Sequence, residues 1–598
     1  MPFPTWQSLP AMFFAQARAL GDRPFLWCKR NGKWEPQSYA DVAGQVRRIA
    51  RSLQALGVAP GDRVALVAEN RPEWTIADMA IMAAGAITVP AFTTNTIADH
   101  RHVLSHSGAK GVIISSRTIA DRVMPAALEA HELSFVVTME ELPIAQRIPK
   151  RLVNWHDLLE AGAGATGDQP DNLDDTVARL QRSDTCCFIY TSGTGGTPKG
   201  VMLTHGSILC NCMGAWNLLQ DLGIGDDVFL CFLPLSHAYE HTVGQFFPMT
   251  VGAQVYFAES VEKLMDNMME ARPTIMTAVP RLYEAMHQRI HRGLAKATPF
   301  QRRMFDMALR LGRKRLNGGL GPIDHLLNLV AEALVRRKLR QRFGGRLKAW
   351  VSGGAALNEE IGLFFLALGV RLLQGYGQTE ASPVVSANPP RRIKIRTVGP
   401  ALAGVEVKIA DDGEILVRSE AVMKGYWRDE GATAAAVRDG WLHTGDIGTL
   451  DGEGYLQITD RKKDIIVLSG GDNVSPARVE GFLVLQPEIN QAMVYGDKHP
   501  HVVALIVPDE ELIRSWAKQN GAAPDLARLS EDDAFQKAFA PVIDRVNAGL
   551  SPIERIRRYA IAPEPFTAEN AMLTVSMKIR RHKIKERYGA LLERLYTA

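Results

Sequence analysis

At 598 residues the chain exceeds the length at which one hydrophobic core usually stops growing, so at least two structural units are expected. Hydrophobic residues make up 46% of the chain and charged residues 22%, which is ordinary for a soluble globular protein and does not favour a disordered one. The 69 lysines and arginines exceed the 65 aspartates and glutamates by only four, so overall charge gives no case for nucleic-acid binding.

The cysteines and the apolar stretches indicate a cytoplasmic protein. None of the six cysteines lies in a CxxC pair or in a Cys/His spacing suited to zinc, so reduced and metal-free thiols are expected. The N-terminal segment has only a brief apolar patch before Gln16 and Arg18, unlike a signal peptide. Residues 79–89 are the best candidate for a membrane span but fall well short of the roughly 20 residues that a spanning helix needs. We interpret them as a buried helix and strand.

An α/β architecture is predicted for most of the chain. Residues 62–139 alternate helix-like segments with short apolar runs such as RVALVAEN and KGVIISS, a pattern typical of parallel strands with crossover helices. The same rhythm continues to about residue 380, and several apolar runs there end in loops that carry Gly, Ser, Thr, Pro or Glu. Because ligands bind outside the carboxyl ends of strands in open α/β sheets, we expect the functional site in these loops.

The pattern changes near Val405. VEVKIA and EILVRS alternate apolar and polar residues around the turn pair Asp412-Gly413, which predicts a hairpin and a β-rich subdomain. After Arg461 a smaller α/β-like stretch follows, with a helix in VSPARVEGFLVLQ and strands in AMVYGD and VVALIVPD. The polar run DRKKD is a natural boundary, so we predict an N-terminal domain over residues 1–460 and a C-terminal domain over residues 461–598.

The loop YTSGTGGTPKGV, residues 190–201, is suited to an anion. Its glycines let backbone N–H groups approach phosphate oxygens. A Walker loop needs Gly immediately before its lysine and Ser or Thr after it, whereas Pro198 precedes Lys199 and Gly200 follows. An ordinary P-loop kinase or GTPase is therefore disfavoured, and the loop by itself fits either a phosphate site or a mobile surface loop.

This loop and six further motifs together resemble the adenylate-forming superfamily, which includes acyl-CoA synthetases, firefly luciferase and nonribosomal-peptide adenylation domains. The further motifs occur in that family's order: LPLSHAYE (233–240), SGGAAL (352–357), GYGQTE (375–380), LHTGD (442–446), DRKKD (460–464) and LTVSMKIRR (573–581). The resemblance implies an α/β fold with a large N-terminal domain of α/β sheet subdomains plus a β-rich subdomain, and a small mobile C-terminal α+β domain. It also implies ATP, Mg²⁺ and coenzyme A as cofactor and co-substrates.

By this resemblance, two sets of residues would hold the nucleotide. Those expected at the phosphates are Thr191, Ser192, Gly193, Thr194 and Lys199 for the β- and γ-phosphates, Thr379 for the α-phosphate and Glu380 for Mg²⁺. Those expected at the nucleoside are Gly353, Gly354 and Ala355 along the adenine, Gly375 beside them, Tyr376 stacked on the base, and Asp446 at the ribose with Arg461 nearby. Without the other motifs, Asp446 in HTGD also fits a turn-capping aspartate.

The resemblance also assigns residues to the chemistry. His237 would position the substrate carboxylate, although an isolated histidine after a strand more often has a structural role. Lys578 would neutralise charge at the acyl-phosphate junction. Val575 stands where long-chain members usually have Pro, and with Lys583 and Lys585 nearby this leaves the register of the lysine open; a solvated basic tail is the alternative. DRKKD marks the family's hinge, with Lys462 and Lys463 at the pivot.

The substrate assignment depends on VPRLYEAMHQRI and the long insertion after it, which resemble the long-chain branch of the family. Within residues 300–346, the basic clusters RKR and RRKLRQR flank the apolar run LLNLVAEAL. This arrangement fits a peripheral contact with the inner face of a membrane, but it also fits a solvated helix pair with ordinary surface arginines, which the clusters alone favour slightly. The oligomeric state stays open.

We therefore predict an enzyme that activates a long-chain fatty acid with ATP and transfers the acyl group to free coenzyme A, since no carrier-protein domain follows Lys578. A fatty acyl-AMP ligase that passes its product to a separate carrier protein, and a catalytically silent lipid-binding relative, are the alternatives.

Overall fold

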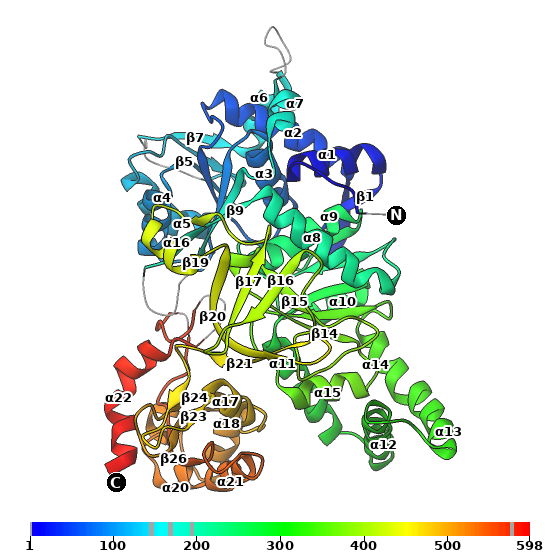
Figure 1. Ribbon diagram of the computed structural model, residues 1–598, viewed down its shortest axis with the longest axis vertical. Helices are drawn as coiled ribbons and strands as arrows, with labels where there is room; N and C mark the ends of the chain where they lie inside the picture. The colour runs from blue at the N-terminus through cyan, green and yellow to red at the C-terminus, as the bar shows by residue number, and fades with distance from the viewer. Residues whose placement is uncertain are drawn as a thin grey trace.

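The computed structural model describes residues 3–142, 149–164, 172–191, 197–567, 569–574 and 579–597. Two eight-stranded sheets form the large N-terminal part (Figure 1). The first has the order β15-β14-β13-β12-β10-β11-β1-β2 and is parallel except for its two outer pairs. Its strands are β1 (Pro24–Arg30), β2 (Lys33–Ser38), β10 (Val228–Cys231), β11 (Gln254–Phe257), β12 (Ile275–Ala278), β13 (Ala349–Ser352), β14 (Leu372–Gly377) and β15 (Val384–Ala387).

The second sheet has the order β18-β9-β8-β4-β3-β5-β6-β7. Its strands are β3 (Arg63–Val67), β4 (Ile87–Pro90), β5 (Ala109–Ile114), β6 (Phe135–Thr138), β7 (Arg151–Asn154), β8 (Thr185–Thr191), β9 (Lys199–Thr204) and β18 (Gly425–Tyr426). The strands β8, β4, β3, β5, β6 and β7 are parallel, whereas β9 and β18 add antiparallel pairs at one edge. The predicted parallel strands of residues 62–139 are confirmed.

Helices fill the space between and around these sheets. The central one, α3 (Pro72–Ala83), is buried on nearly every side, and β4 follows it, which confirms the interpretation of residues 79–89 as helix and strand. Within the described part of the chain, no helix combines the length and apolarity needed to cross a bilayer. The other helices of this region are α1 (Leu9–Leu20), α2 (Tyr39–Ala55), α4 (Ile97–Ser107), α5 (Arg117–Glu129), α6 (Trp155–Gly164), α7 (Leu173–Arg179), α8 (His205–Leu219), η1 (Gln220–Leu222), the π-helical η2 (Glu240–Phe246), α9 (Phe247–Thr250) and α10 (Leu264–Ala271).

A helical insertion and a third sheet complete the N-terminal part. The insertion lies between β12 and β13 and comprises α11 (Pro280–Ala295), α12 (Pro299–Leu316), α13 (Pro322–Ala331), the π-helical η3 (Glu332–Arg336) and α14 (Arg337–Arg342). Two helices, α15 (Glu359–Ala367) and the short η4 (Thr379–Ala381), flank β14. The third sheet is antiparallel and contains β16 (Val405–Ile409), β17 (Glu414–Ser419), β19 (Val437–Arg438), β20 (Trp441–Leu450) and β21 (Leu456–Arg461), with α16 (Glu430–Ala436) beside it. The predicted hairpin at Asp412-Gly413 joins β16 to β17.

The C-terminal part, drawn from dark yellow to red at the bottom of Figure 1, has its own apolar cores. A three-stranded sheet in the order β24-β25-β26 carries helices on its faces, and a two-stranded β22-β23 ladder precedes it. The elements are β22 (Ile466–Val467), β23 (Asn473–Val474), α17 (Pro476–Val484), β24 (Ile489–Tyr495), β25 (Val502–Pro508), α18 (Glu510–Gln519), α19 (Leu526–Leu529), α20 (Asp533–Lys537), α21 (Ala540–Ala548), β26 (Ile556–Ile561) and α22 (Arg581–Thr597). The helix and two strands predicted here are α17, β24 and β25.

Candidate functional site

The hairpin of β8 and β9 carries the two ends of the predicted phosphate loop. Thr191 ends β8 and pairs with Lys199, the first residue of β9. Ser192, Gly193 and Thr194 lie outside the described residues. The ammonium group of Lys199 lies 3.0 Å from the carboxylate oxygen Oδ2 of Asp429 and 5.2 Å from the ring centroid of Tyr426. A cation is therefore held at the mouth of the loop.

Tyr426 links this lysine to the predicted magnesium ligand. Its hydroxyl donates a hydrogen bond of 2.9 Å to Oε1 of Glu380, which lies in η4 directly after β14. Burial and the carboxylates of Glu380 and Asp429 raise the pKa of Tyr426, so this hydroxyl stays protonated. Sequence reasoning missed Tyr426 and Asp429. They stand in GYWRD, just beyond the predicted hairpin, and only the pairing of β18 with β9 brings them here.

The predicted ribose site forms a second cluster. The Tyr376 hydroxyl in β14 donates a hydrogen bond of 2.6 Å to Oδ2 of Asp446, and Nε of Arg461 lies 3.4 Å from Oδ1 of the same carboxylate. Asp446 and Arg461 are cross-strand partners of β20 and β21. Asp446 lies inside a strand and its carboxylate faces Tyr376 and Arg461, so the turn-capping alternative is wrong. Asp446 is only 6% exposed, and Tyr376 and Arg461 hold its carboxylate, so this group is a preorganised hydrogen-bond acceptor.

The predicted adenine loop follows β13 and lies close to another strand end. The Gly353 amide donates a hydrogen bond of 3.1 Å to the Ala278 carbonyl, and Gly354 has a positive φ of +83°. A Cβ atom on Gly353 would lie 3.0 Å from the Tyr239 ring, so a larger residue would force this ring to move slightly. Tyr239 is held by its own hydrogen bond of 2.9 Å to the Val351 carbonyl. Ala355, the next residue of the loop, is exposed.

The close packing of β14 against β15 explains why residue 375 is a glycine. A Cβ atom there would lie 3.1 Å from the Ser386 carbonyl oxygen, across the antiparallel pair of β14 and β15. This close contact keeps β14 in position. The strand places Tyr376 in the ribose cluster and leads directly to Thr379 and Glu380 in η4. One strand end therefore serves both clusters.

His237 lies in the turn between β10 and η2. Its Nδ1 accepts a hydrogen bond of 3.2 Å from the Tyr239 amide, and its carbonyl accepts one of 3.0 Å from the His241 amide. Because Nδ1 accepts, a neutral ring carries its hydrogen on Nε2. The half-buried ring is thus oriented by the backbone of the segment that also presents Tyr239 to the adenine loop.

Two ionisable residues of η2 lie deeper in the core. Glu240 is fully buried and accepts a hydrogen bond of 2.5 Å from the Thr277 hydroxyl, and burial raises its pKa to about 7. Burial lowers the pKa of His241, but the Asp78 carboxylate 2.8 Å away outweighs this and raises it to about 10. Both residues are buried and tie η2 to its neighbours, Glu240 to Thr277 in β12 and His241 to Asp78 in α3.

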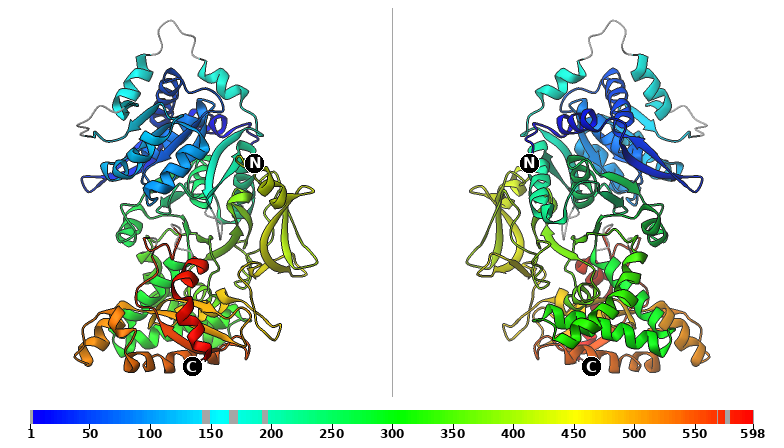
Figure 2. Two further views of the ribbon diagram at one scale, coloured as in Figure 1. Left: turned by 90° about the vertical axis from the view of Figure 1, so that its left-hand side faces the viewer. Right: turned by 90° about the vertical axis from the view of Figure 1, so that its right-hand side faces the viewer.

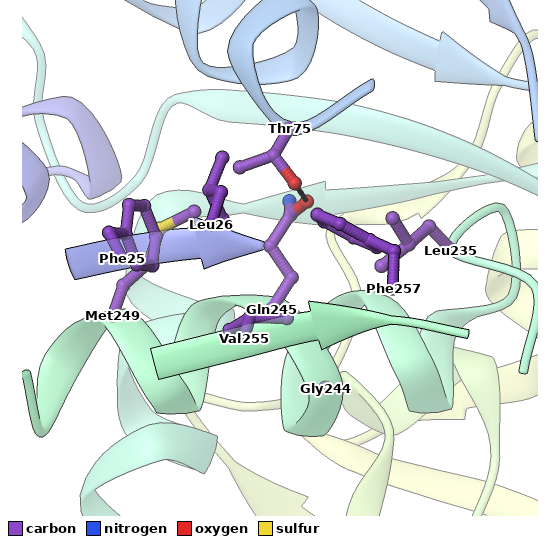
Figure 3. Close-up of a pocket in the computed structure, with 9 residues that line it drawn as sticks. All are labelled: Phe25, Leu26, Thr75, Leu235, Gly244, Gln245, Met249, Val255 and Phe257. Atoms are coloured by element: carbon purple, nitrogen blue, oxygen red, sulfur yellow. Dashed lines mark hydrogen bonds between the residues drawn. The ribbon is translucent and has the colours of Figure 1, made fainter. Parts of the chain in front are cut away.

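Figure 3 shows a small apolar pocket beside η2, lined in part by Gly244 and Gln245 of that helix. Phe25, Leu26, Val255 and Phe257 line it from β1 and β11, and a hydrogen bond of 2.8 Å from Thr75 to Gln245 crosses one end. The pocket is too small for a water molecule. It is a packing gap between α3 and the first sheet, and carries no ligand site.

Replacing Glu240 by glutamine is expected to change how stability depends on pH. A carboxylic acid whose pKa is raised on folding binds more protons when folded, so the wild type loses stability as pH rises from about 4.5 to about 7. A glutamine keeps the Thr277 contact and cannot ionise, so the variant should gain up to about 3 kcal/mol over the wild type between these limits. Denaturant unfolding of both proteins at pH 5 and pH 8 measures this. Equal changes in both proteins would contradict it.

The predicted hinge segment is attached to the third sheet by Lys462. The Lys462 ammonium group bonds to Oδ2 of Asp412 at 2.5 Å and lies 3.3 Å from Oε2 of Glu414. Asp460, just before it, is buried, which raises the pKa of its carboxyl group. Contacts between the C-terminal and N-terminal parts include the Asn358 amide to the Gly481 carbonyl at 3.1 Å, the Ser475 hydroxyl to the Thr459 carbonyl at 3.3 Å and Arg292 to Glu511 at 3.2 Å, and Leu485 packs against an apolar cluster of the N-terminal part.

Lys578 lies outside the described residues, but both flanks of its segment are anchored. Leu573 and Ile579 face each other in an isolated β-bridge, and the Arg580 amide bonds to the Met572 carbonyl at 2.9 Å. Arg581 then makes two bonds of 2.5 and 2.6 Å to the two oxygens of Glu480 in α17. This bidentate arginine–carboxylate pair fixes the position of the first residue of α22.

The residues brought together are suited to a nucleotide with its metal. Lys199 and Glu380 lie on two sides of Tyr426, and Tyr376, Asp446 and Arg461 form the second cluster. In the described part of the chain, no three Cys, His, Asp or Glu side chains form a metal cage. One carboxylate such as Glu380, combined with substrate phosphates, is nevertheless a normal environment for Mg²⁺.

Comparison with known proteins gives consistent matches. The AMP-binding enzyme family matches residues 13–427, and the AMP-binding enzyme C-terminal domain matches residues 463–598. The long-chain-fatty-acid–CoA ligase FadD15 of Mycobacterium tuberculosis is 35% identical over 599 residues, covering 99% of this chain and 97% of that protein. The peroxisomal long chain acyl-CoA synthetase 7 of Arabidopsis thaliana is 30% identical, covering 95% of this chain and 82% of that protein.

Solved structures match in fold. The A-PCP didomain of a carboxylic acid reductase from Segniliparus rugosus, in complex with AMP, superposes with a TM-score of 0.75 at 22% identity, covering 99% of this chain and 82% of that one. ATP-bound MatB from Rhodopseudomonas palustris gives a TM-score of 0.69 at 22% identity, covering 98% of this chain and all of that one. The predicted fold, a large N-terminal α/β part with a β-rich sheet and a smaller C-terminal part, is confirmed.

Proposed function

Because this chain belongs to the AMP-binding enzyme family, we propose that it activates a long-chain fatty acid with ATP and then transfers the acyl group to coenzyme A. The observation that carries the proposal is the convergence of two polar clusters on the end of β14, one built on Lys199, Tyr426 and Glu380 and the other on Tyr376 and Asp446. The full-length similarity to two proteins named as long-chain fatty acid ligases or synthetases supports the substrate class.

In the first step a carboxylate oxygen of the acid attacks the α-phosphorus of ATP, and the bond to the leaving pyrophosphate breaks. Catalysis of such a step is mainly positioning and charge stabilisation. Thr191 and Lys199, with Ser192, Gly193 and Thr194, hold the β- and γ-phosphates, and Thr379 holds the α-phosphate. Glu380 would hold Mg²⁺, which would supply positive charge to neutralise the phosphates. Tyr426 fixes the Glu380 carboxylate by its hydrogen bond and lies beside the Lys199 ammonium group.

The nucleoside is held at the other cluster. Gly353, Gly354 and Ala355 follow the adenine, the Tyr376 ring stacks on it, and Gly375 keeps this strand close to its neighbour. Asp446 accepts hydrogen bonds from the ribose hydroxyls while Arg461 and Tyr376 hold its carboxylate in place. His237 orients the carboxylate of the acid.

In the second step the thiol of coenzyme A attacks the acyl carbonyl carbon and AMP leaves with the electrons of the broken bond. We place the border of the two domains at 460/461, with Lys462 and Lys463 at the pivot, so that residues 461–598 rotate between the steps and withdraw Lys578. The contacts between the two parts include exposed polar pairs, such as that of Arg292 and Glu511. Breaking such contacts costs little, which favours rotation.

The test is a panel of carboxylic acids from acetate to oleate, with pyrophosphate and acyl-CoA measured with and without coenzyme A. We expect pyrophosphate release with long-chain acids and acyl-CoA formation when coenzyme A is present. Adenylation without coenzyme A turnover would favour the acyl-AMP ligase, and failure to release pyrophosphate with any acid would favour a silent lipid-binding relative.

The proposed location is the cytoplasm, with residues 300–346 in contact with the inner face of a membrane. A long-chain acid partitions into bilayers, so an enzyme that consumes it benefits from proximity to that source. The helices of this insertion, α12, α13 and α14, would form such a contact.

A further inference from the structure

The insertion forms a helical platform beside the C-terminal part. In Figure 1, α12 and α13 extend to the lower right, and they face the viewer in the right-hand view of Figure 2, next to the orange elements. One side of α13 packs inward. The apolar cluster beneath it comprises Ala308, Leu311 and Ala331, with Met307, Leu320, Leu327 and Val335 packed against them.

A buried arginine makes this platform rigid. The Arg336 side chain is fully buried, and its guanidinium donates to the carbonyls of Ala367 at 3.1 Å and Ala308 at 2.8 Å and to Oδ1 of Asn328 at 2.6 Å. These partners belong to α15, α12 and α13. A Cβ atom on Gly312 would lie 2.1 Å from the Ala367 carbonyl oxygen, so α12 also contacts the backbone of α15 directly. The orientation of α13 is therefore set by packing.

The outward side of α13 is also apolar. Ile323 is 76% exposed, and Leu326 and Leu329 are each 67% exposed. Val330 and Leu334 extend the same apolar surface, since positions 323, 326, 330 and 334 recur at helical spacing. A helix that faces only water would carry polar residues here, and a contiguous exposed apolar patch of this kind marks an interaction site. We name these five residues the α13 face.

The surroundings of the α13 face are strongly basic. Residues 299–342 contain eleven arginines and lysines against three carboxylates, Asp306, Asp324 and Glu332. Several of the basic side chains are exposed and form no salt bridge within the described part of the chain; these are Arg315, Arg337, Lys338 and Arg342. A second copy of the chain would bring the same positive charge against this region, whereas anionic lipid headgroups would neutralise it.

We propose that the α13 face docks on a bilayer that contains anionic lipids. The helix lies in the plane of the interface, with Ile323, Leu326 and Leu329 among the acyl chains and the basic residues of α12 and α14 at the headgroups. This proposal extends the proposed function and depends on it for its purpose. Docking holds the enzyme at the membrane in which its fatty acid substrate is dissolved. Membrane binding itself is inferred from the exposed apolar face and the basic residues around it, and it can be measured without an activity assay.

Vesicle co-sedimentation of the full-length protein tests the proposal. The wild type is expected to bind phosphatidylcholine vesicles that contain about 30% phosphatidylglycerol, and to bind pure phosphatidylcholine vesicles much more weakly. Replacing Ile323, Leu326 and Leu329 together by glutamine should weaken binding at least about 10-fold. Leu128→Gln is the matched control, because Leu128 is 42% exposed on α5, far from the platform, and this variant should bind as the wild type does.

A charge variant tests the second half of the proposal. The triple change R315Q, R337Q and K338Q should weaken binding to anionic vesicles and reduce its dependence on salt, because these side chains have no salt bridge to lose. Unchanged binding in either triple variant overturns the proposal, as does equal binding of the wild type to both kinds of vesicle. A dimer in solution that the glutamine variant abolishes would also overturn it, since the α13 face would then belong to a second copy.

The ligase reaction provides a separate readout. With a medium-chain acid in vesicle-free solution, both triple variants should turn over as the wild type does, because none of the replaced residues lies in the nucleotide clusters. If the wild type binds anionic vesicles yet releases no pyrophosphate with any acid, the proposed function fails while the docking surface stands.

Discussion

Replacing Lys578 by alanine is expected to slow acyl-adenylate formation by about 10²- to 10³-fold, the usual cost of removing one charge-stabilising group from an active site. Thioester formation from supplied acyl-adenylate should stay close to the wild-type rate, because the proposed rotation withdraws this lysine before the second step. Single-turnover assays of the two half-reactions measure the split. Equal loss in both would contradict the role proposed for Lys578.

Two neighbouring lysines provide matched controls. Lys583 forms a salt bridge of 2.7 Å to Glu586 on the surface of α22, and the Lys585 ammonium group lies 5.2 Å from the ring centroid of Tyr495. Both have local partners within the C-terminal part, so K583A and K585A should leave adenylation nearly unchanged. If either variant shows the large loss in place of K578A, the register taken from LTVSMKIRR is wrong. The anchored pair of Arg581 and Glu480 favours a fixed register, since it sets the start of α22.

Replacing Asp446 by asparagine is expected to lower kcat/KM for ATP by about 10²-fold, because a buried charged acceptor for the ribose becomes neutral. The amide would also present an N–H group to Arg461 or Tyr376, which both donate to this side chain in the wild type. The loss should appear mainly in KM for ATP, with KM for the acid little changed.

Two variants make this result interpretable. Y376F removes one hydrogen bond to Asp446 and keeps the ring, so a loss of no more than about 10-fold is expected. D451N is the matched charge control, since Asp451 lies in the turn between β20 and β21 and pairs with Lys394 on the surface. A KM for ATP that D446N leaves unchanged, or that D451N raises equally, would remove Asp446 from the nucleotide site.

Several strands and one hairpin could be predicted from the sequence because their signals are local. Parallel strands buried on both faces are continuous apolar runs, so β3, β5 and β8 could be recognised without coordinates. The hairpin at Asp412-Gly413 could be recognised because the turn needs a positive φ, and Gly413 adopts one of +84°. The motifs that end these strands could be assigned to the nucleotide only through the family resemblance.

Other features depend on contacts between segments that are distant in the chain. Tyr426 comes between Lys199 and Glu380 because β18 adds to the edge of β9, and a two-residue strand has no periodicity to reveal it. Asp446 was open to a turn-capping interpretation because HTGD has turn composition, yet the pairing of β20 with β21 places it in a strand opposite Arg461. The apolar run of residues 326–334 gave no indication of which side would be buried.

The sequence by itself determined the local chemistry of this protein: the strand ends, the Gly-rich loop without a Walker pattern, the hairpin and the basic insertion. These depend on neighbours along the chain, whose preferences for burial and backbone angle are local. Tertiary structure alone decided which side chains meet. It placed Tyr376 on Asp446, put Tyr426 between a lysine and a carboxylate, and locked α13 through the buried Arg336 so that leucines face water. Such pairings are set by the packing of whole sheets and helices, which no short stretch of residues encodes.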